Sequence, residues 1–314
     1  MMHVYQVMPA KKVKADTKTE QTTAVVVIEP EPNKAVFSPS ASKLCFGAHF
    51  LDGYVIRRLV ELNKICCQHS LMMVGDAYIR FQCKNAEDSA QASYFSDTIL
   101  AAPRFGVYNF NRPAPDVDLL LIHTNLTEMA QALSDVRKKM PVTISHFEGE
   151  KRLRVTRSST IKNPDYVSIL MTDEQPSEPP EVSVPDHTPN ITLSVSDFCS
   201  NSAKFVGRKV KYVECTMFAR KMHWAGYIDE TRCVKEHTFE NETLEAPPAE
   251  DTKPIQKYIF PKRFISVLSK LKQIPAEKST VRIFHSKDSP LKIQIDVATI
   301  GMTNIYLRDT FQHN

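Results

Sequence analysis

The chain has 314 residues, of which 42% are hydrophobic and 24% are charged, and its formal net charge is +4. This length predicts two domains, and the apolar fraction is large enough for sizeable cores. No apolar run approaches the roughly 20 residues of a membrane span, and the N-terminus lacks a signal-peptide core. We therefore expect a protein of the cytosol or nucleus that is neither secreted nor bound to a membrane.

The sequence carries none of the common motifs for catalysis or metal binding. Its seven cysteines form no pair of C-x-x-C units, so we interpret them as reduced core thiols. The chain has only eight glycines, and no phosphate-binding loop, G-x-G-x-x-G, H-E-x-x-H or G-x-S-x-G motif. We therefore predict no catalytic residue, no metal site and no cofactor, and hence no enzyme.

The elements in chain order begin with a polar extension, residues 1–43, whose composition predicts disorder. Apolar residues at helical spacing then predict four helices, separated by strands with alternating apolar residues. These helices span residues 51–64, 125–139, 196–211 and 261–272. An acidic, proline-rich segment, residues 172–190, reads as an extended linker. It would separate a first domain, residues 44–171, from a second, residues 191–314.

Two stretches of the chain read as copies of one structural unit. Residues 117–155 and 255–297 each run from an apolar strand through a helix with a basic exit to two further strands. Upstream, residues 46–82 and 191–230 supply a similar first half of each unit. The repeat predicts an α+β fold of two similar domains, each with two helices packed on antiparallel sheets. Chance similarity between two ordinary segments is the alternative.

The predicted helices are strongly positive, whereas the rest of the chain is slightly acidic. A single basic helix is usually only a solvated face. Four equivalent basic helices are harder to explain in this way. If the sheets lie outside and the helices line one common surface, that surface would attract a polyanion.

From about Phe46 to Asp309 the sequence resembles the sliding clamps of the proliferating cell nuclear antigen (PCNA) type. The resemblance is carried by FLDGYVIRRLVEL in the first helix, by FPKRFISVLSK followed by STVRIF, and by the tail SPLKIQIDVATIGMTNIYLRD. It is diffuse, but the order of its pieces matches. It implies a DNA-clamp fold and a ring of three identical protomers arranged head to tail, with helices lining the central hole.

The resemblance implies a DNA polymerase processivity factor for DNA replication and repair. Such a ring encircles duplex DNA, and phosphate contacts let it slide without reading sequence. The basic residues that match the family's DNA-facing positions, or lie on the same predicted helices, are Arg57, Arg58, Lys64, Arg137, Lys138, Lys139, Lys204, Arg208, Lys209, Lys211, Lys262, Arg263, Lys270 and Lys272.

The resemblance also implies partners: polymerases and other replication proteins that place a short motif in an apolar pocket beside the linker and the C-terminal tail, and a clamp loader. The sequence departs from the family because residues 84–91 are polar and Arg308 and Asp309 replace an Ala-Pro ending. We therefore expect the usual motif to bind weakly, or a different motif to be used. The residues that match the pocket by position are Val182, Val184, Pro185, Pro290, Tyr306 and Leu307. For Tyr306 and Leu307 the alternative is that the pair only caps the last strand of the sheet.

A head-to-tail ring closes when unpaired edge strands of neighbouring protomers pair. By position we expect these edges at residues 151–157 and 220–229. The residues expected to add side-chain burial at these edges are Leu153, Val155, Trp224 and Tyr227. For Trp224, the only tryptophan, a position in the core is the alternative.

Two other functions stay open. One is a clamp-fold protein that forms no homotrimer: a subunit of a checkpoint-type heterotrimer, or a monomeric or dimeric viral processivity factor. The other is a scaffold whose basic helices bind an acidic protein surface and not DNA. The extension, residues 1–43, and an enlarged acidic loop at residues 239–254 indicate a divergent clamp, such as one from a large DNA virus, in the nucleus or at a cytoplasmic viral replication site.

Overall fold

The computed structural model describes residues 42–85, 93–112, 118–157, 163–170, 176–180, 188–240, 253–274 and 279–309. Nearly all of the expected extension therefore lies outside the described residues. Of the expected linker, residues 176–180 and 188–190 are described.

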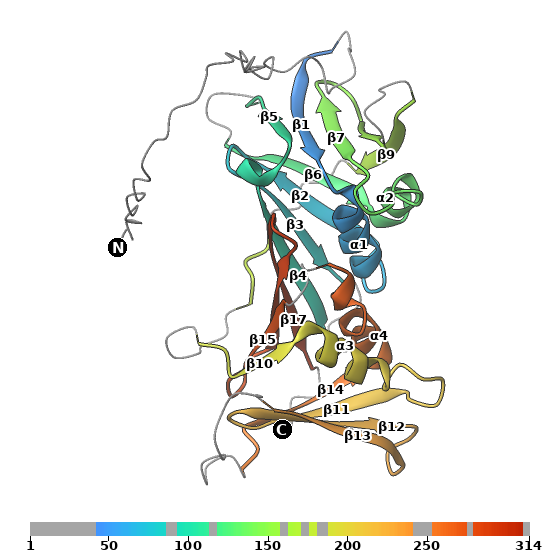
Figure 1. The fold of residues 1–314 in the computed structure, drawn as a ribbon, viewed down its shortest axis with the longest axis vertical. Coiled ribbons are helices and arrows are strands. Elements are labelled where there is room, and N and C mark those ends of the chain that lie inside the picture. The colour runs from blue at the N-terminus through green and yellow to red at the C-terminus, as the bar shows by residue number, and fades with distance from the viewer. Residues whose placement is uncertain are drawn as a thin grey trace, which may run out of the picture. The chain divides into compact units, whose positions relative to one another are not determined.

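The first half of the described chain folds into a module of strands and two helices (Figure 1). In chain order its elements are β1 (Leu44–Phe50), α1 (Gly53–Asn63), β2 (His69–Val74), β3 (Tyr78–Lys84), β4 (Ser93–Ala101), η1 (Ala102–Arg104), β5 (Val107–Phe110), β6 (Leu120–Asn125), α2 (Leu126–Ala132), β7 (Val142–Phe147), β8 (Arg152–Thr156) and β9 (Asp165–Leu170).

The second half repeats this order without the short elements η1 and β5 and with an additional short helix, η4, after α4. Its elements are β10 (Ile191–Ser194), α3 (Val195–Ala203), β11 (Tyr212–Met217), β12 (Lys221–Tyr227), β13 (Cys233–Glu240), β14 (Gln256–Pro261), α4 (Lys262–Leu268), η4 (Leu271–Gln273), β15 (Thr280–Phe284), β16 (Leu291–Val297) and β17 (Gly301–Arg308). The predicted α+β class, with two helices in each module, is confirmed.

Strands from both modules share one sheet. Thirteen strands follow the order β10-β15-β16-β17-β4-β3-β2-β6-β9-β8-β7-β1-β5, and a second sheet has the order β13-β12-β11-β14. The modules meet where β17 pairs antiparallel with β4, from Gly301 opposite Leu100 to Arg308 opposite Ser93. A continuous main-chain ladder thus joins the modules, and the exact domain boundaries at residues 171 and 191 stay a prediction.

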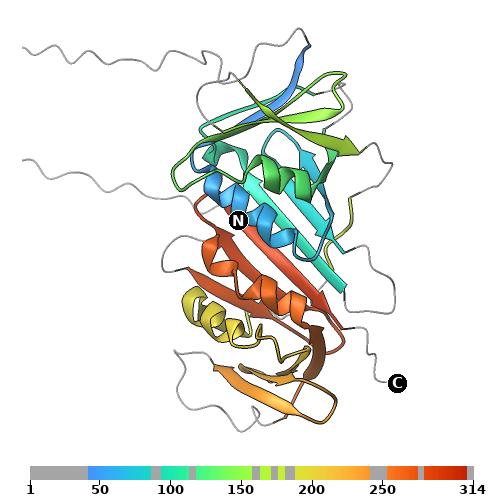
Figure 2. The ribbon, with the colours of Figure 1, turned by 90° about the vertical axis from the view of Figure 1, so that its right-hand side faces the viewer.

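All four helices lie on one side of the sheets, where Figure 2 shows them next to one another. Helix α1 illustrates the reason, because Val55, Ile56 and Leu59 recur at helical spacing and are buried against the strands. The helix begins after Asp52, whose side chain accepts a hydrogen bond from the backbone N–H of Tyr54. The helices of the described residues therefore cover one face of the sheets.

The helices are shorter than the sequence predicts. Helix α2 ends at Ala132, α3 at Ala203 and α4 at Leu268, so the basic stretches that follow them are turns and, after α4, the short helix η4. After α2 the chain bends so that Val136 reaches the core, and Lys139 adopts a positive φ of 63° that no α-helix can contain. Helical periodicity does not reveal this bend because the buried Val136 continues the apolar spacing.

The core of the second module is built around Trp224. Its indole is fully buried and packs edge to face on Phe198, Phe205 and Phe239. Most of the cysteines are also core thiols, as expected, but Cys233 on β13 is exposed. The prediction of a core thiol is therefore wrong for Cys233, which follows a polar turn and begins an alternating strand, a position that fits either a buried or an exposed side chain.

Candidate nucleic-acid and partner interfaces

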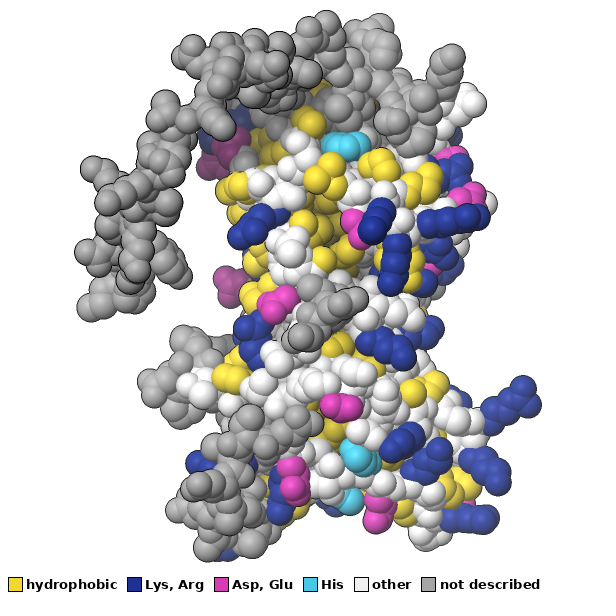
Figure 3. Space-filling model, viewed as in Figure 1, with side chains coloured by type: hydrophobic (Ala, Val, Ile, Leu, Met, Phe, Trp, Pro, Cys, Tyr) yellow, Lys and Arg dark blue, Asp and Glu magenta, His cyan; other side chains and the backbone are white. Residues whose placement is uncertain are grey.

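Most of the basic residues expected to face DNA lie in the turns that follow the helices. Among them the exposed ones are Lys64, Arg137, Lys138, Lys139, Lys204, Arg208, Lys209, Lys211, Lys270 and Lys272. Lys262 and Arg263 open α4 and are half-buried. Figure 3 shows Lys and Arg side chains gathered on the side of the molecule where Figure 1 places the helices. The helices and their exits thus share one strongly basic surface.

Two arginines of this surface are held by a neighbouring carboxylate. Arg57 Nε donates to Glu61 Oε1 at 2.7 Å, and Arg57 Nη1 donates to the carbonyl oxygen of Val136 at 2.9 Å. Arg58 also pairs with Glu61, and its guanidinium lies 4.6 Å from the centroid of the Tyr54 ring. Burial opposes ionisation of Glu61, but the hydrogen bonds from both arginines lower its pKa. Glu61 therefore neutralises part of the charge on α1.

Glu61 was not among the sequence-based candidates, although its spacing carried the signal. A carboxylate four residues after Arg57 and three after Arg58 lies on the same helix face as both. The expected DNA-facing role of these two arginines stays a prediction, and the structure adds that each is already paired.

The prediction that residues 151–157 and 220–229 form edge strands is wrong. Strand β8 lies between β7 and β9, and β12 lies between β11 and β13. Leu153, Val155 and Trp224 are fully buried in the subunit's own core, so they cannot form a contact between subunits. Tyr227 is half-buried and stacks on Tyr212 at 5.3 Å. The alternation of these strands signals one buried face but does not identify the neighbours.

Among the strands of the described residues, β13 and β9 have edges that a neighbouring copy could pair with. Strand β13 pairs with β12 and ends its sheet. Strand β9 pairs with β8 from Asp165 to Ser168, and on its other side it pairs with β6 only at Ile169 and Leu170. Within the stretch that pairs only with β8, Tyr166 is 48% exposed, which is unusual for a large hydrophobic residue among those described. The outer edge of β9 is thus open along its first residues.

Two residues of the expected partner pocket lie on β17, and their side chains point to opposite faces of the sheet. Val182, Val184 and Pro185 lie outside the described residues, as does most of the polar loop at residues 84–91. Leu307 is fully buried and faces the helix side, as in the capping alternative, and Pro290 is also buried. Tyr306 alternates with Leu307 and faces the sheet side away from the helices.

Asp309 explains the departure at the tail. Its Oδ2 accepts a hydrogen bond from the backbone N–H of Ile259, at 2.6 Å, on the edge strand β14. In the first module a short backbone ladder closes the corresponding place, where β9 meets β6. The carboxylate of Asp309 therefore satisfies a donor that would otherwise be left on an open edge.

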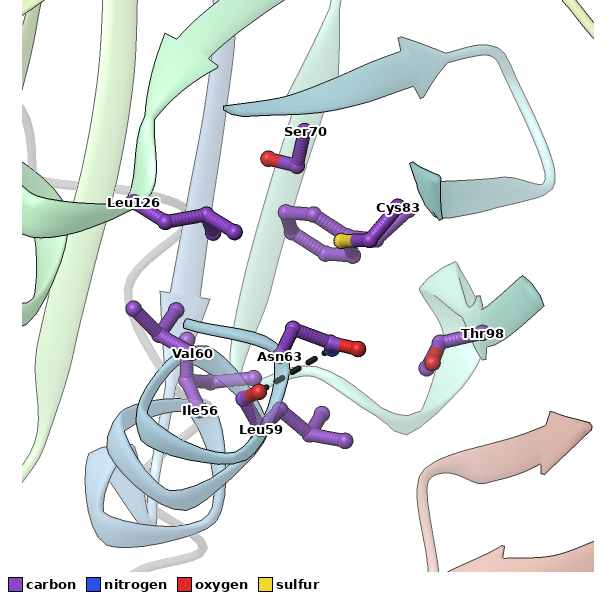
Figure 4. A pocket seen from close by; sticks show the side chains of 9 residues that line it. Ile56, Leu59, Val60, Asn63, Ser70, Cys83, Thr98 and Leu126 are labelled. Carbon is purple, nitrogen blue, oxygen red and sulfur yellow. Dashed lines mark hydrogen bonds between the residues drawn. The ribbon is translucent and has the colours of Figure 1, made fainter. Parts of the chain in front are cut away.

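A hollow beneath α1 is lined by core residues. Figure 4 shows Ile56, Leu59, Val60 and Asn63 of α1 facing Ser70, Cys83, Thr98 and Leu126, with Phe81 completing the wall. Asn63 donates to the carbonyl oxygen of Leu59 and accepts from Tyr94 and Ser96. These bonds anchor the end of α1 to β4, so the hollow belongs to the packing of the module.

No group of three or more potential metal ligands occurs within the part of the chain that the structure describes. In the same residues, no helix is long and apolar enough to cross a membrane.

The repeated modules, with helices on one face and antiparallel sheets on the other, define the DNA-clamp fold. A solved structure with this fold is PCNA from Entamoeba histolytica. The present chain is 16% identical to it, with a TM-score of 0.65, over 85% of this chain and 100% of the other. No protein-family model and no curated protein matches the sequence.

Proposed function

We propose that this protein is a DNA sliding clamp: a homotrimeric ring that encircles duplex DNA, acts as a polymerase processivity factor and tethers replication and repair proteins without catalysing a reaction. The observation that carries the proposal is the internal junction of β17 with β4. In the repeated order of elements, β9 corresponds to β17 and β13 corresponds to β4. Both of these corresponding strands have an open edge: β13 ends its sheet, and β9 is unpaired on one side along its first residues.

Equivalent surfaces that pair within the chain can also pair between chains. If β9 of one copy joins β13 of the next as β17 joins β4, each contact is head to tail, and such contacts close a ring when their rotation divides the circle. Three chains would then contribute six similar modules. Pairing also removes the exposed donors and acceptors of both edges.

The register of the internal junction predicts the residues that meet between copies. When the strand ladders of the two modules are aligned, Tyr166 corresponds to Tyr306 and Asp165 to Ile305. In the same alignment, Cys233 corresponds to Phe95 and Lys235 to Ser96. Within the chain, Tyr306 lies opposite Phe95 and Ile305 lies opposite Ser96. Copied to the edges, this register sets Tyr166 opposite Cys233 and Asp165 opposite Lys235 of the neighbouring copy. The second pair has opposite charges, which favours the same register.

The basic helix side supports DNA as the encircled polymer. In the ring, the sides that carry Lys204, Arg208 and Lys209 would all face the central hole. Contacts from flexible lysines and arginines to phosphates are sequence-independent and weaken with salt by roughly 0.9 in the logarithmic slope for each phosphate neutralised. The ring then holds DNA by enclosure, while these contacts align it and permit sliding.

The solution mass tests the assembly. Light scattering behind size-exclusion chromatography should give about three times the chain mass of 35.6 kDa, independent of concentration. A stable monomer or dimer would contradict the ring and would favour a factor that grips DNA by charge, or a subunit of a heterotrimer. On circular DNA the loaded ring should resist a salt wash, and linearising the DNA should release it.

A further inference from the structure

One row of side chains crosses five strands on the sheet face away from the helices. Each member lies directly opposite the next in the antiparallel ladders, so all of them point to the same face. The row, called the outer row below, consists of Lys84 on β3, Phe95 on β4, Tyr306 on β17, Lys292 on β16 and Phe284 on β15. It combines two cations with three aromatic rings and spans both modules.

The rings form the floor of this surface. Phe95 and Tyr306 are in contact, with centroids 5.8 Å apart, and Lys292 Nζ lies 4.9 Å from the Phe284 centroid and 5.9 Å from that of Tyr306. The aromatic residues are only 6–7% exposed. Lys84 at one end of the row is exposed, as is Arg308, which follows Tyr306 by two residues on the same face. Apolar rings thus lie beneath a rim of cations.

Lys292 is the least hydrated of these cations. It is half-buried, and desolvation lowers its pKa, although the nearby charge of Asp97 acts in the opposite direction. The described residues give its ammonium group no hydrogen bond or ion pair, only the faces of two rings. Asp97 is already engaged by Arg80 through two hydrogen bonds, at 2.6 and 2.9 Å. A desolvated ammonium without an anion gains most from an incoming carboxylate.

Another segment of the described chain, residues 176–180, reaches the strand that carries Lys84. Gln82, two residues from Lys84 on the same face, binds the backbone of Ser177 in both directions: its Nε2 donates to the carbonyl oxygen at 2.8 Å, and its Oε1 accepts from the N–H at 3.0 Å. This two-point bond imitates one step of a β-ladder. The face can therefore hold an extended backbone by means of side-chain amides.

We propose that the outer row binds an acidic partner segment in extended form, in which carboxylates flank an apolar or aromatic side chain. The apolar group would contact Phe95 and Tyr306, and a carboxylate would pair with Lys292. This inference rests on the proposed tethering function and names the chemistry of the tethered partner. Basic segments are disfavoured because Lys84, Lys292 and Arg308 would repel them, which gives selectivity through charge.

A set of synthetic peptides tests the proposal. The probe is a fluorescein-labelled peptide of about twelve residues in which aspartates flank a Leu-Phe pair, compared with versions that carry asparagine or lysine instead of aspartate. Binding is measured by fluorescence anisotropy with the full chain. We expect the aspartate peptide to bind at least about tenfold more tightly than the asparagine peptide, a difference of about 1.4 kcal/mol, and the lysine peptide to bind weakest.

Substitution of Lys292 locates the effect. Lys292→Met should lower the affinity for the aspartate peptide to that of the asparagine peptide, while leaving the latter unchanged, and Lys292→Arg should retain the preference. Lys151→Met, at an exposed lysine in the turn between β7 and β8, is the matched control and should change neither affinity. Equal binding of the three peptides, binding of none, or equal losses for all peptides in Lys292→Met would overturn the proposal.

The solution mass of the same samples separates this inference from the ring. A trimer that shows no preference for the acidic peptide would contradict the outer-row proposal alone. A monomer that keeps the preference would contradict the ring and leave the outer row as the binding site.

Discussion

Arg57 and Glu61 lie one turn apart on α1, and the 2.7 Å bond between Arg57 Nε and Glu61 Oε1 holds a cation of the basic surface to a carboxylate. A phosphate that approaches Arg57 or Arg58 must compete with Glu61 for the same donors. Glu61 therefore limits how much charge α1 can offer to a polyanion.

Replacing Glu61 with glutamine should strengthen DNA binding. Arg57 and Arg58 would keep their packing but lose the competing anion. The slope of log affinity against log salt should then steepen by up to about 0.9 for each additional phosphate contact. Fluorescence anisotropy on short duplexes at several salt concentrations measures both quantities. Glu148→Gln, at an exposed carboxylate that follows β7, is the control, and an equal effect of both variants would refute the specific role of Glu61.

The register between neighbouring copies predicts a covalent trap. With Tyr166→Cys, the new thiol should lie opposite Cys233 of the next copy, at the separation of directly paired strand residues, which suits a disulfide. Mild oxidation should then convert the chain into a covalent trimer on a non-reducing gel. The double variant with Cys233→Ser should remain monomeric on that gel. Oxidised Tyr166→Cys that stays monomeric while the solution mass is trimeric would show that another register or another pair of strands forms the contact.

Acid should destabilise the protein through buried histidine. Burial lowers the pKa of His285 to about 4, whereas an unfolded histidine titrates near pH 6.5. Between these values the unfolded chain binds more protons, so the stability is fully present above about pH 6.5 and is lost as the pH falls towards 4. The contribution of this group is at most roughly 3 kcal/mol. Burial also lowers the pKa of His49, His146 and His237, and this adds to the same trend.

Urea unfolding at several pH values between 7 and 4.5 measures this dependence. His285→Met should flatten the fall in the free energy of unfolding, since an apolar side chain of similar length carries no proton to exchange. His69→Gln, at an exposed position, should leave the fall unchanged. The explanation fails if His285→Met retains the full dependence of the natural protein.

Gly301 should be required where the two modules join. A Cβ at this position would lie 2.1 Å from the carbonyl oxygen of Ile99, so β17 and β4 could not stay paired at that point without moving apart. We expect Gly301→Ala to lower the free energy of unfolding by about 2 kcal/mol or more. Gly207→Ala is the control, because a Cβ there would meet no atom within 4 Å. Thermal unfolding compares the two, and equal stability would contradict a close approach at Gly301.

The sequence by itself determined the α+β class, the repeat of strands and helices, and the faces that each helix buries. These features follow from local patterns: Val55, Ile56 and Leu59 recur at helical spacing, and strands alternate with a period of two. The basic character of the helix side was also visible, because charge accumulates on segments that are contiguous in sequence.

Only the tertiary structure decided which strands are neighbours. Alternation in β8 and β12 marks a buried face but is the same for a central strand and an edge strand, so the predicted interface position of Leu153 and Val155 is wrong, and for Trp224 the core alternative holds. Of the outer row, only Tyr306 was a sequence-based candidate for partner binding. The rest could not be predicted for the same reason, since Lys84 and Lys292 are brought onto one face by ladders between segments far apart in the chain. Pairing partners depend on contacts of long range, whereas periodicity records only which side of a strand is buried.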